Sequence, residues 1–207
     1  MKCISPNLAW KIGTHLNEKG ERKDTVTFSP NEAMKVIGPE MMDMMAMPMP
    51  CGKCVECMRN KRMEQAVRIT HEIEGHEDNC FITLTYNNES LPMTDGQNDA
   101  RGIQDDSRFI PTLRIKDYQD WLKRFRKKIK IHYGKDVRYF IVGEYGAKGK
   151  RPHYHAVIFG WKPDDLVEHK YCGKYWTYRS KFVEKTWKYG FIEIGVDVNA
   201  GVAKYCA

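Results

Sequence analysis

The spacing of apolar residues between Ile115 and Ile129 constrains the fold of this chain more than any other feature. Apolar residues recur there at intervals of three and four: Ile115, Tyr118, Leu122, Phe125 and Ile129. This spacing predicts a helix with one apolar stripe, which Gly134 can terminate. Because such a stripe must be buried against another element, the neighbouring segments have to supply an apolar surface.

Strand patterns precede and follow this helix. Residues 80–86 are rich in β-branched and aromatic side chains, which favours a strand. Residues 137–145 and 153–159 are two further strand-like runs, and the glycine- and lysine-rich segment 146–150 between them predicts a β-hairpin.

The last third of the chain repeats the alternation. Residues 182–187 indicate a helix that stops at Gly190, and residues 191–198 indicate a strand. The tail from Asn199 can begin one more helix. From Cys80 onward the order is strand, helix, strand, strand, helix, strand. This order predicts an α+β domain with a ferredoxin-like antiparallel sheet (βαββαβ) backed by helices.

The first third is expected to form a separate element, residues 1–75, packed on a catalytic domain of residues 76–207. Residues 7–30 indicate a hairpin, and the proline-containing, methionine-rich stretch 41–50 indicates an irregular connector. An amphipathic helix is expected from residue 58 to about residue 74.

The net charge of +7 favours a polyanionic partner, although an excess of this size also occurs in proteins that it merely keeps in solution. The basic residues on the 115–129 helix leave the same two interpretations open. No apolar run is long enough to span a bilayer, and the first residues lack a secretory signal. We therefore expect a cytoplasmic protein without a membrane partner.

Three of the seven cysteines, Cys51, Cys54 and Cys57, have the spacing of a metal knuckle, and Cys3 is available as a fourth thiolate. We interpret them as a structural Zn²⁺ site that stabilises the N-terminal element. An iron–sulfur cluster is the lesser alternative because the usual fourth cysteine and its proline are absent, and disulfides are a weaker one. Cys80 is expected in the core, with Cys172 and Cys206 as free thiols.

His153 and His155 are alternate residues of a predicted strand, so both imidazoles should lie on one face of the sheet. If the hairpin turn is centred between Lys148 and Gly149, Glu144 lies opposite His153 on that face. Two imidazoles and a carboxylate suit Mg²⁺ or Mn²⁺ bound with a phosphate. The alternatives are histidines that only pack, and a Glu144 that faces solvent after a one-residue change of register.

Several segments together resemble the motifs of rolling-circle replication initiators, the metal-dependent endonucleases of the His-hydrophobe-His type. They are residues 81–86 (FITLTY), 143–146 (GEYG), 151–160 (RPHYHAVIFG) and 202–205 (VAKY). The segment 51–57 (CGKCVEC) makes the match closer, to the initiators of small single-stranded DNA phages of the microvirus family, gokushovirus branch. The resemblance covers nearly the whole chain.

This resemblance implies a divalent ion held by His153, His155 and Glu144, with Tyr205 as the nucleophile on a helix and Lys204 beside it. Attack by Tyr205 on single-stranded origin DNA would leave a 5′-phosphotyrosyl enzyme and a free 3′-hydroxyl, and the reverse reaction would rejoin the strand. Host replication proteins are further expected partners, which would place a phage-encoded protein in the cytoplasm of its bacterial host.

The chain departs from the family pattern near its end. Related phage initiators often carry two tyrosines four residues apart, but the partner position of Tyr205 is Gly201. The lysine that the family places three residues after the nucleophile would fall beyond Ala207. We therefore expect that the chain can continue further, and a surface role for Tyr205 stays open.

Contacts to DNA are expected from Lys148, Lys150 and Arg151 beside the metal group. Aromatic residues between Tyr171 and Trp176 can stack on bases or pack internally. Two other functions remain open: a non-catalytic, zinc-containing module that binds single-stranded nucleic acid, and a relaxase or transposase of the same chemical superfamily.

Overall fold

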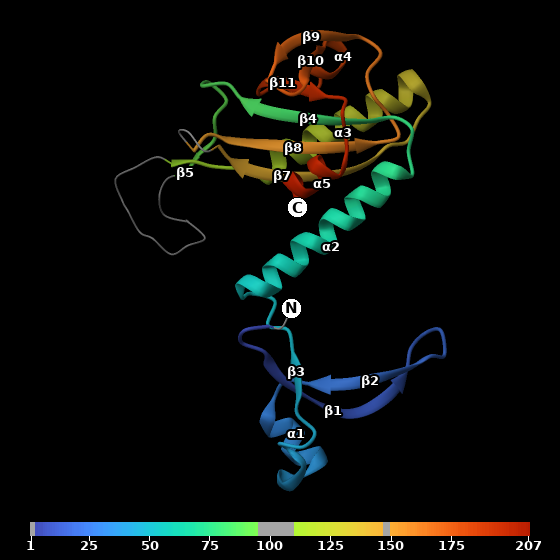
Figure 1. Ribbon diagram of the computed structural model, residues 1–207, viewed down its shortest axis with the longest axis vertical. Coiled ribbons are helices and arrows are strands. Elements are labelled where there is room, and N and C mark those ends of the chain that lie inside the picture. The colour runs from blue at the N-terminus through green and yellow to red at the C-terminus, as the bar shows by residue number, and fades with distance from the viewer. Residues whose placement is uncertain (1–2, 95–109, 147–149) are drawn as a thin grey trace. The chain divides into compact units, whose positions relative to one another are not determined.

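A computed structural model describes residues 3–94, 110–146 and 150–207 of the chain. The chain divides into two compact units, Met1–Glu64 and Gln65–Ala207 (Figure 1). Helix α2, Val55–Glu74, contributes residues to both units. The domain division expected near residue 75 stays a prediction.

The first unit contains a small antiparallel sheet. Strands β1 (Asn7–Leu16) and β2 (Arg22–Thr27) form the predicted hairpin, and β3 (Met47–Met49) pairs with the other edge of β1. The methionine-rich stretch is therefore less irregular than expected. It contains this short strand, and the 3-10 helix η1 (Pro39–Met41) begins just before it.

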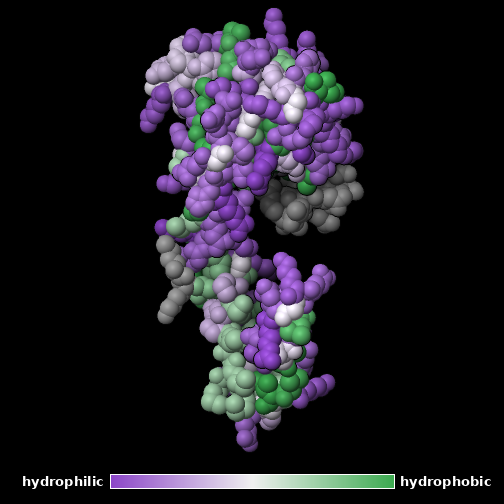
Figure 2. Space-filling view, turned by 90° about the vertical axis from the view of Figure 1, so that its right-hand side faces the viewer, coloured by the Kyte–Doolittle hydropathy of each residue, from purple (hydrophilic) through white to green (hydrophobic). Residues whose placement is uncertain are grey.

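Helix α1 (Pro30–Ile37) follows β2, and its first turn is capped by the Ser29 side chain, which accepts a hydrogen bond from the Glu32 N–H. Large hydrophobic side chains stay exposed on the first unit, among them Met44, Met47 and Met49. Figure 2 shows hydrophobic surface gathered on this unit, whereas hydrophilic residues dominate the second unit in the same view.

The second unit is built on a six-stranded antiparallel sheet with strand order β7-β8-β4-β11-β10-β9. Its strands are β4 (Asn79–Tyr86), β7 (Arg138–Tyr145), β8 (Pro152–Phe159), β9 (Leu166–Tyr171), β10 (Trp176–Ser180) and β11 (Gly190–Gly195). Its further helices are α3 (Ile115–Tyr133), α4 (Lys181–Glu184) and α5 (Ala200–Cys206), and β5 (Met93–Thr94) pairs with β6 (Ile110–Pro111). The predicted α+β class is confirmed.

Helix α3 covers one face of this sheet with the apolar stripe seen in the sequence. Trp121, Phe125 and Ile129 are fully buried against alternate residues of β4, which include Ile82 and Leu84. Gly134 ends the helix in the left-handed conformation, and its N–H donates to the Lys130 carbonyl. No helix among the described residues is long and apolar enough to cross a membrane.

The opposite face of the sheet is covered only in part. Ile69 and Ile73 of α2 pack there with Ala203 and Cys206 of α5, around Val157 of β8. Figure 1 shows α5 on the side of the sheet away from α3. The uncovered part of this face, over β4, β11 and β10, forms the wall of a cleft.

Three elements differ from the sequence predictions. The hairpin of β9 and β10 was not predicted. Helix α4 ends at Glu184, where the Thr186 N–H turns back to the Val183 carbonyl, so the predicted helix over 182–187 is too long. Strand β11 ends at Gly195 rather than at residue 198, and α5 follows.

Gly190 begins β11 at the closest backbone approach in the described part of the sheet. A Cβ atom at this position would lie 2.3 Å from the Thr85 carbonyl oxygen and 2.4 Å from the Asn87 nitrogen, and the residue has a φ of +154°. A side chain would thus push β11 away from β4, and β4 carries the face used by the site described below.

We therefore expect Gly190→Ala to lower the free energy of unfolding by about 2–4 kcal/mol, because overpacking and backbone strain act together. Urea unfolding followed by tryptophan fluorescence measures this. Gly195→Ala is the matched control in the same strand, since its Cβ would meet Phe81 at 3.8 Å, an ordinary contact. Equal destabilisation by both variants would contradict the interpretation.

Candidate metal and nucleophile site

Strand β8 places two imidazoles side by side. His153 and His155 lie on the partly covered face of the sheet, while Tyr154 between them is buried on the α3 face. The two ring centroids are 4.7 Å apart and the ring planes are nearly perpendicular, at 86°. The expectation that alternate residues share one face is confirmed.

Strand β7 brings a carboxylate to the same place. Glu144 pairs with His153 in the β7–β8 ladder, as the hairpin register predicted. Its Oε2 lies 3.2 Å from His155 Nε2 and 3.8 Å from His153 Nε2. One potential ligand atom from each of the three residues lies within 4.8 Å of the others, so Glu144, His153 and His155 form a group that could hold a metal ion.

Hydrogen bonds on the far side of each imidazole fix its orientation. His153 Nδ1 donates to the Arg151 carbonyl at 3.0 Å, and His155 Nδ1 lies 3.1 Å from the Thr83 hydroxyl. Phe81 stacks on the His155 ring at a centroid distance of 5.1 Å. Both Nε2 atoms are thereby left facing Glu144, which is the arrangement that a metal ligand needs.

Burial keeps His155 in the neutral form. Removal from water lowers the pKa of its imidazole to about 4, and the neighbouring His153 adds to this effect, while Glu144 opposes it. A neutral imidazole has a free lone pair on nitrogen and can therefore bind a cation at neutral pH. The donor set of two imidazoles and one carboxylate fits a divalent ion.

Helix α5 carries Tyr205 to this group. The Tyr205 hydroxyl donates to Glu144 Oε2 at 2.7 Å and lies 3.2 Å from His155 Nε2. Asn199 caps the helix by accepting from the Gly201 N–H, and Ala203 and Cys206 bury its inner face. The ring of Tyr205 stays 57% exposed, so a substrate can reach its oxygen.

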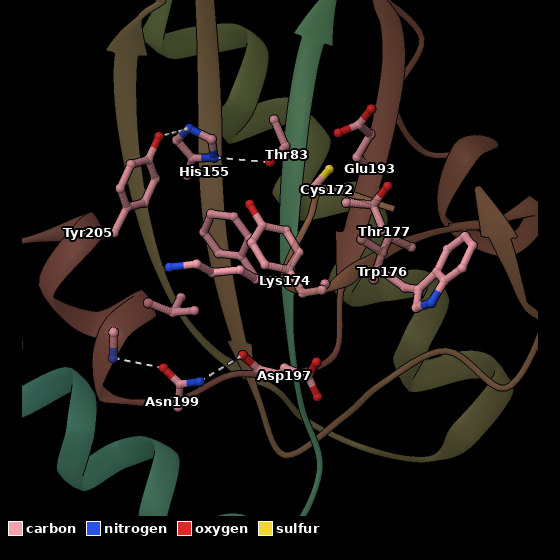
Figure 3. A pocket seen from close by; sticks show the side chains of 16 residues that line it. Thr83, His155, Cys172, Lys174, Trp176, Thr177, Glu193, Asp197, Asn199 and Tyr205 are labelled. Carbon is pink, nitrogen blue, oxygen red and sulfur yellow. Dashed lines mark hydrogen bonds between the residues drawn. The ribbon is translucent and has the colours of Figure 1, made fainter. Parts of the chain in front are cut away.

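A cleft of about 790 Å³ extends from these residues across β4, β11 and the β9–β10 hairpin (Figure 3). Tyr205 and His155 line one end, and Trp176 lines the other. A phenol oxygen, a possible cation group and an adjoining cleft can together serve attack on an extended phosphodiester substrate.

The basic residues expected at this site have different surroundings. The Arg151 guanidinium donates to the Tyr86 carbonyl and to Asn88 Oδ1, so it also ties β8 to the end of β4. Lys150 and Lys204 are exposed, whereas Lys148 lies outside the described residues.

A second group of potential ligands lies in the first unit. Cys3, Cys51, Cys54 and Cys57 bring their sulfur atoms within 4.8 Å of one another. Two of the sulfur pairs are 3.7 Å and 4.0 Å apart, near the roughly 3.8 Å edge of a tetrahedron with 2.3 Å metal–sulfur bonds. The N–H groups of Cys57 and Ile4 lower the pKa of the Cys54 thiol to about 6. The group therefore fits a metal that prefers thiolates.

The other cysteines are placed as expected: Cys80 is buried in the core, and Cys172 and Cys206 are free thiols. Sequence reasoning missed Thr83, Glu193 and Trp176 as residues of the site. The alternation of residues 81, 83 and 85 in the predicted strand contained a signal for Thr83. Glu193 and Trp176 could be placed only once the β9–β10 hairpin and the neighbouring strand order were known.

Comparison with known proteins identifies relatives. The family model of the replication-associated protein ORF2 matches residues 79–207. The replication-associated protein ORF4 of Chlamydia phage 1 is 36% identical, over 71% of this chain and 34% of the relative. The replication-associated protein VP4 of Bdellovibrio phage phiMH2K is 34% identical, over 100% of this chain and 58% of the relative.

A third relative, the replication-associated protein ORF2 of Spiroplasma virus 4, is 33% identical, over 70% of this chain and 42% of the relative. The chain thus spans between about a third and three fifths of the length of these curated relatives. No solved structure matches it significantly.

We expect Thr83→Val to weaken binding of Mn²⁺ about 10- to 100-fold, because it removes the partner that orients His155. The loss of the free Mn²⁺ signal in electron paramagnetic resonance measures this binding. Thr85→Val is the matched control, since Thr85 lies on the same strand and face but is paired with His153, whose Nδ1 bonds to the Arg151 carbonyl. An equal change in both variants would refute the role of Thr83.

Proposed function

Because this chain belongs to the replication-associated protein ORF2 family, we propose that it is a site-specific endonuclease and strand transferase that nicks single-stranded DNA to initiate rolling-circle replication. One observation carries the proposal. The Tyr205 hydroxyl lies within hydrogen-bonding distance of both Glu144 and His155, in the group that could hold a metal ion.

In the proposed reaction, the Tyr205 oxygen attacks the phosphorus of the scissile phosphodiester. A tyrosyl–phosphorus bond forms, the bond from phosphorus to the 3′-oxygen breaks, and the 3′-oxygen leaves with a proton as a free hydroxyl. Glu144, which accepts the Tyr205 hydrogen bond, is placed to take the phenolic proton. The phosphotyrosyl ester conserves the bond energy, so the 3′-hydroxyl of a strand can reverse the step and no nucleotide cofactor is needed.

His153, His155 and Glu144 would hold the catalytic Mg²⁺ or Mn²⁺. When bound, such an ion supplies positive charge that stabilises the transition state at the scissile phosphate. The residues of the chain perform the other tasks: Thr83 and the Arg151 carbonyl orient the imidazoles, and α5 positions the phenol.

The strand order supports a ferredoxin-like catalytic sheet. The segments β4, α3, β7, β8, α4 and β11 follow the βαββαβ order, and the four strands lie side by side as β7-β8-β4-β11. The β9–β10 hairpin is inserted between β8 and α4 and extends the sheet beyond β11.

Single-stranded origin DNA is the proposed substrate, with phosphate contacts from Lys148, Lys150, Arg151 and Lys204. Replication proteins of a bacterial host are proposed partners, and its cytoplasm is the proposed location, since the relatives are phage proteins. A structural Zn²⁺ on Cys3, Cys51, Cys54 and Cys57 is proposed to stabilise the first unit.

The experiment that tests the function incubates labelled phage origin single strands with the chain and Mn²⁺, and separates the products on a denaturing gel. We expect cleavage and a covalent protein–DNA adduct, both lost in Tyr205→Phe, which removes only the attacking oxygen. DNA binding should change little, because the basic surface is intact. A chelator should abolish the adduct as well.

Tyr139→Phe is the matched control, since this exposed tyrosine of β7 lies opposite Ile158, a residue of the α3 side. An adduct that persists in Tyr205→Phe would show that another residue attacks. DNA binding without any cleavage would favour the non-catalytic binding module. Cleavage by a chain that cannot initiate replication on a phage origin would favour a relaxase or transposase.

For the cysteine group we expect one zinc per chain by elemental analysis, and its loss in Cys54→Ser. Because structural zinc contributes to folding, a strong chelator should raise hydrogen exchange in the first unit before it affects the large sheet. Cys172→Ser is the control, as Cys172 is an exposed thiol outside the group. Full zinc content in Cys54→Ser would contradict the assignment.

A further inference from the structure

The part of the cleft beyond Tyr205 has no task in the reaction described above. It is lined on the β9–β10 side by Lys174, Tyr175 and Trp176, and on the sheet by Phe81 and Glu193. Its volume of about 790 Å³ falls in the range of pockets that bind small organic molecules, so it can accommodate a nucleotide.

The hairpin side offers aromatic rings to a ligand. Tyr175 is 52% exposed and Trp176 is 42% exposed, although both line a concave surface. The Cys172 N–H donates to the Tyr175 carbonyl, which holds the end of the hairpin together. Exposed rings beside a binding cleft are the usual platform on which unpaired bases stack.

The charges of the cleft argue for a base rather than a phosphate beyond the Tyr205 end. Among its lining residues, Lys174 is the one lysine or arginine in the described part of the chain, whereas Glu193 and Asp197 are both acidic. Two carboxylates repel a phosphate. Phosphate is accordingly favoured at the Tyr205 end, and a neutral nucleobase in the remainder.

Glu193 is positioned by the sheet. It pairs with Thr83 in the β11–β4 ladder, and Thr83 in turn contacts His155, so Glu193 lies one strand away from the metal-binding group. Its side chain is 46% exposed, and His169 Nε2 is 3.9 Å from its Oε1. Figure 3 shows Glu193 on the opposite side of the cleft from Asp197.

A carboxylate only accepts hydrogen bonds, so it selects bases by their N–H groups. Guanine is the one DNA base with two adjacent N–H donors on its pairing edge, N1–H and N2–H, which match the two oxygens of a carboxylate. Unpaired bases expose this edge.

We propose that the cleft binds one unpaired base of the DNA substrate next to the scissile phosphate, and that Glu193 makes the cleft selective for guanine while Trp176 stacks on the base. The inference rests on the proposed function, since it takes single-stranded DNA as the substrate. It adds a determinant of sequence preference to the cleavage chemistry.

The test measures binding by fluorescence anisotropy, in the Tyr205→Phe background so that no strand is cut. The probes are oligothymidylates of about twelve nucleotides that carry one central guanine, adenine, cytosine or hypoxanthine. We expect guanine to bind about tenfold more tightly than the others. Hypoxanthine should lose most of this gain, because it lacks the N2 amino group.

Glu193→Gln should abolish the preference for guanine and leave the other three affinities equal or higher, since it removes a negative charge. Trp176→Ala should weaken all four probes about tenfold. Two matched controls should retain the preference: Asp197→Asn within the cleft, and Glu168→Gln on β9, which is not among the lining residues.

A guanine preference that persists in Glu193→Gln overturns the proposal, as does equal binding of all four probes by the parent protein. Unchanged affinities in Trp176→Ala overturn the stacking contact. The outcome is independent of the nicking assay. Guanine selectivity without a Tyr205 adduct would refute the proposed nickase and leave the base site, whereas an adduct without selectivity would refute the base site alone.

Discussion

The pairing of β7 with β8 is the constraint on which the candidate site depends. Glu144 faces the two histidines only because it pairs with His153, and a shift by one residue would turn it to the α3 face. The apolar neighbours enforce this register, since Phe140 and Val142 share the face of Glu144 and pack with Val157. The hydrophobic pattern of two strands thus sets the geometry of three polar side chains, and the site needs little further structure to be formed.

The two faces of the sheet have different tasks as a result. The α3 face is closed by large apolar side chains, and its buried polar groups are paired, as where the Tyr86 hydroxyl donates to Asp117. On the other face α2 and α5 cover only the β7–β8 side, which leaves the cleft over β4, β11 and β10. Stability therefore comes chiefly from the closed face, and the open face can carry polar and exposed aromatic residues that would weaken a core.

Sequence reasoning found the elements whose patterns are strong and local. The stripe of α3, the β7–β8 register and the Cys51–Cys57 spacing were all visible, because each reflects a short-range period or a short turn. The β9–β10 hairpin was missed because β9 is an edge strand whose side chains are nearly all exposed, so it lacks the alternation of a half-buried strand. The contact of Thr83 with His155 joins residues 72 positions apart and follows only from the β4–β8 pairing, which no local pattern contains.

The hydrogen bond from Tyr205 to Glu144 also bears on how the nucleophile is controlled. Burial of the phenol, and then the bond and charge of Glu144, raise the pKa of Tyr205, so the protonated form is favoured in the chain alone. The contact that holds the oxygen in place therefore also keeps it protonated. A positive charge beside Glu144 would weaken this effect, because it stabilises the phenolate and competes for the same carboxylate oxygen. In the proposed reaction, attack would thus depend on the cation as well as on the DNA, and α5 would keep the phenol within reach of the phosphate until both are bound.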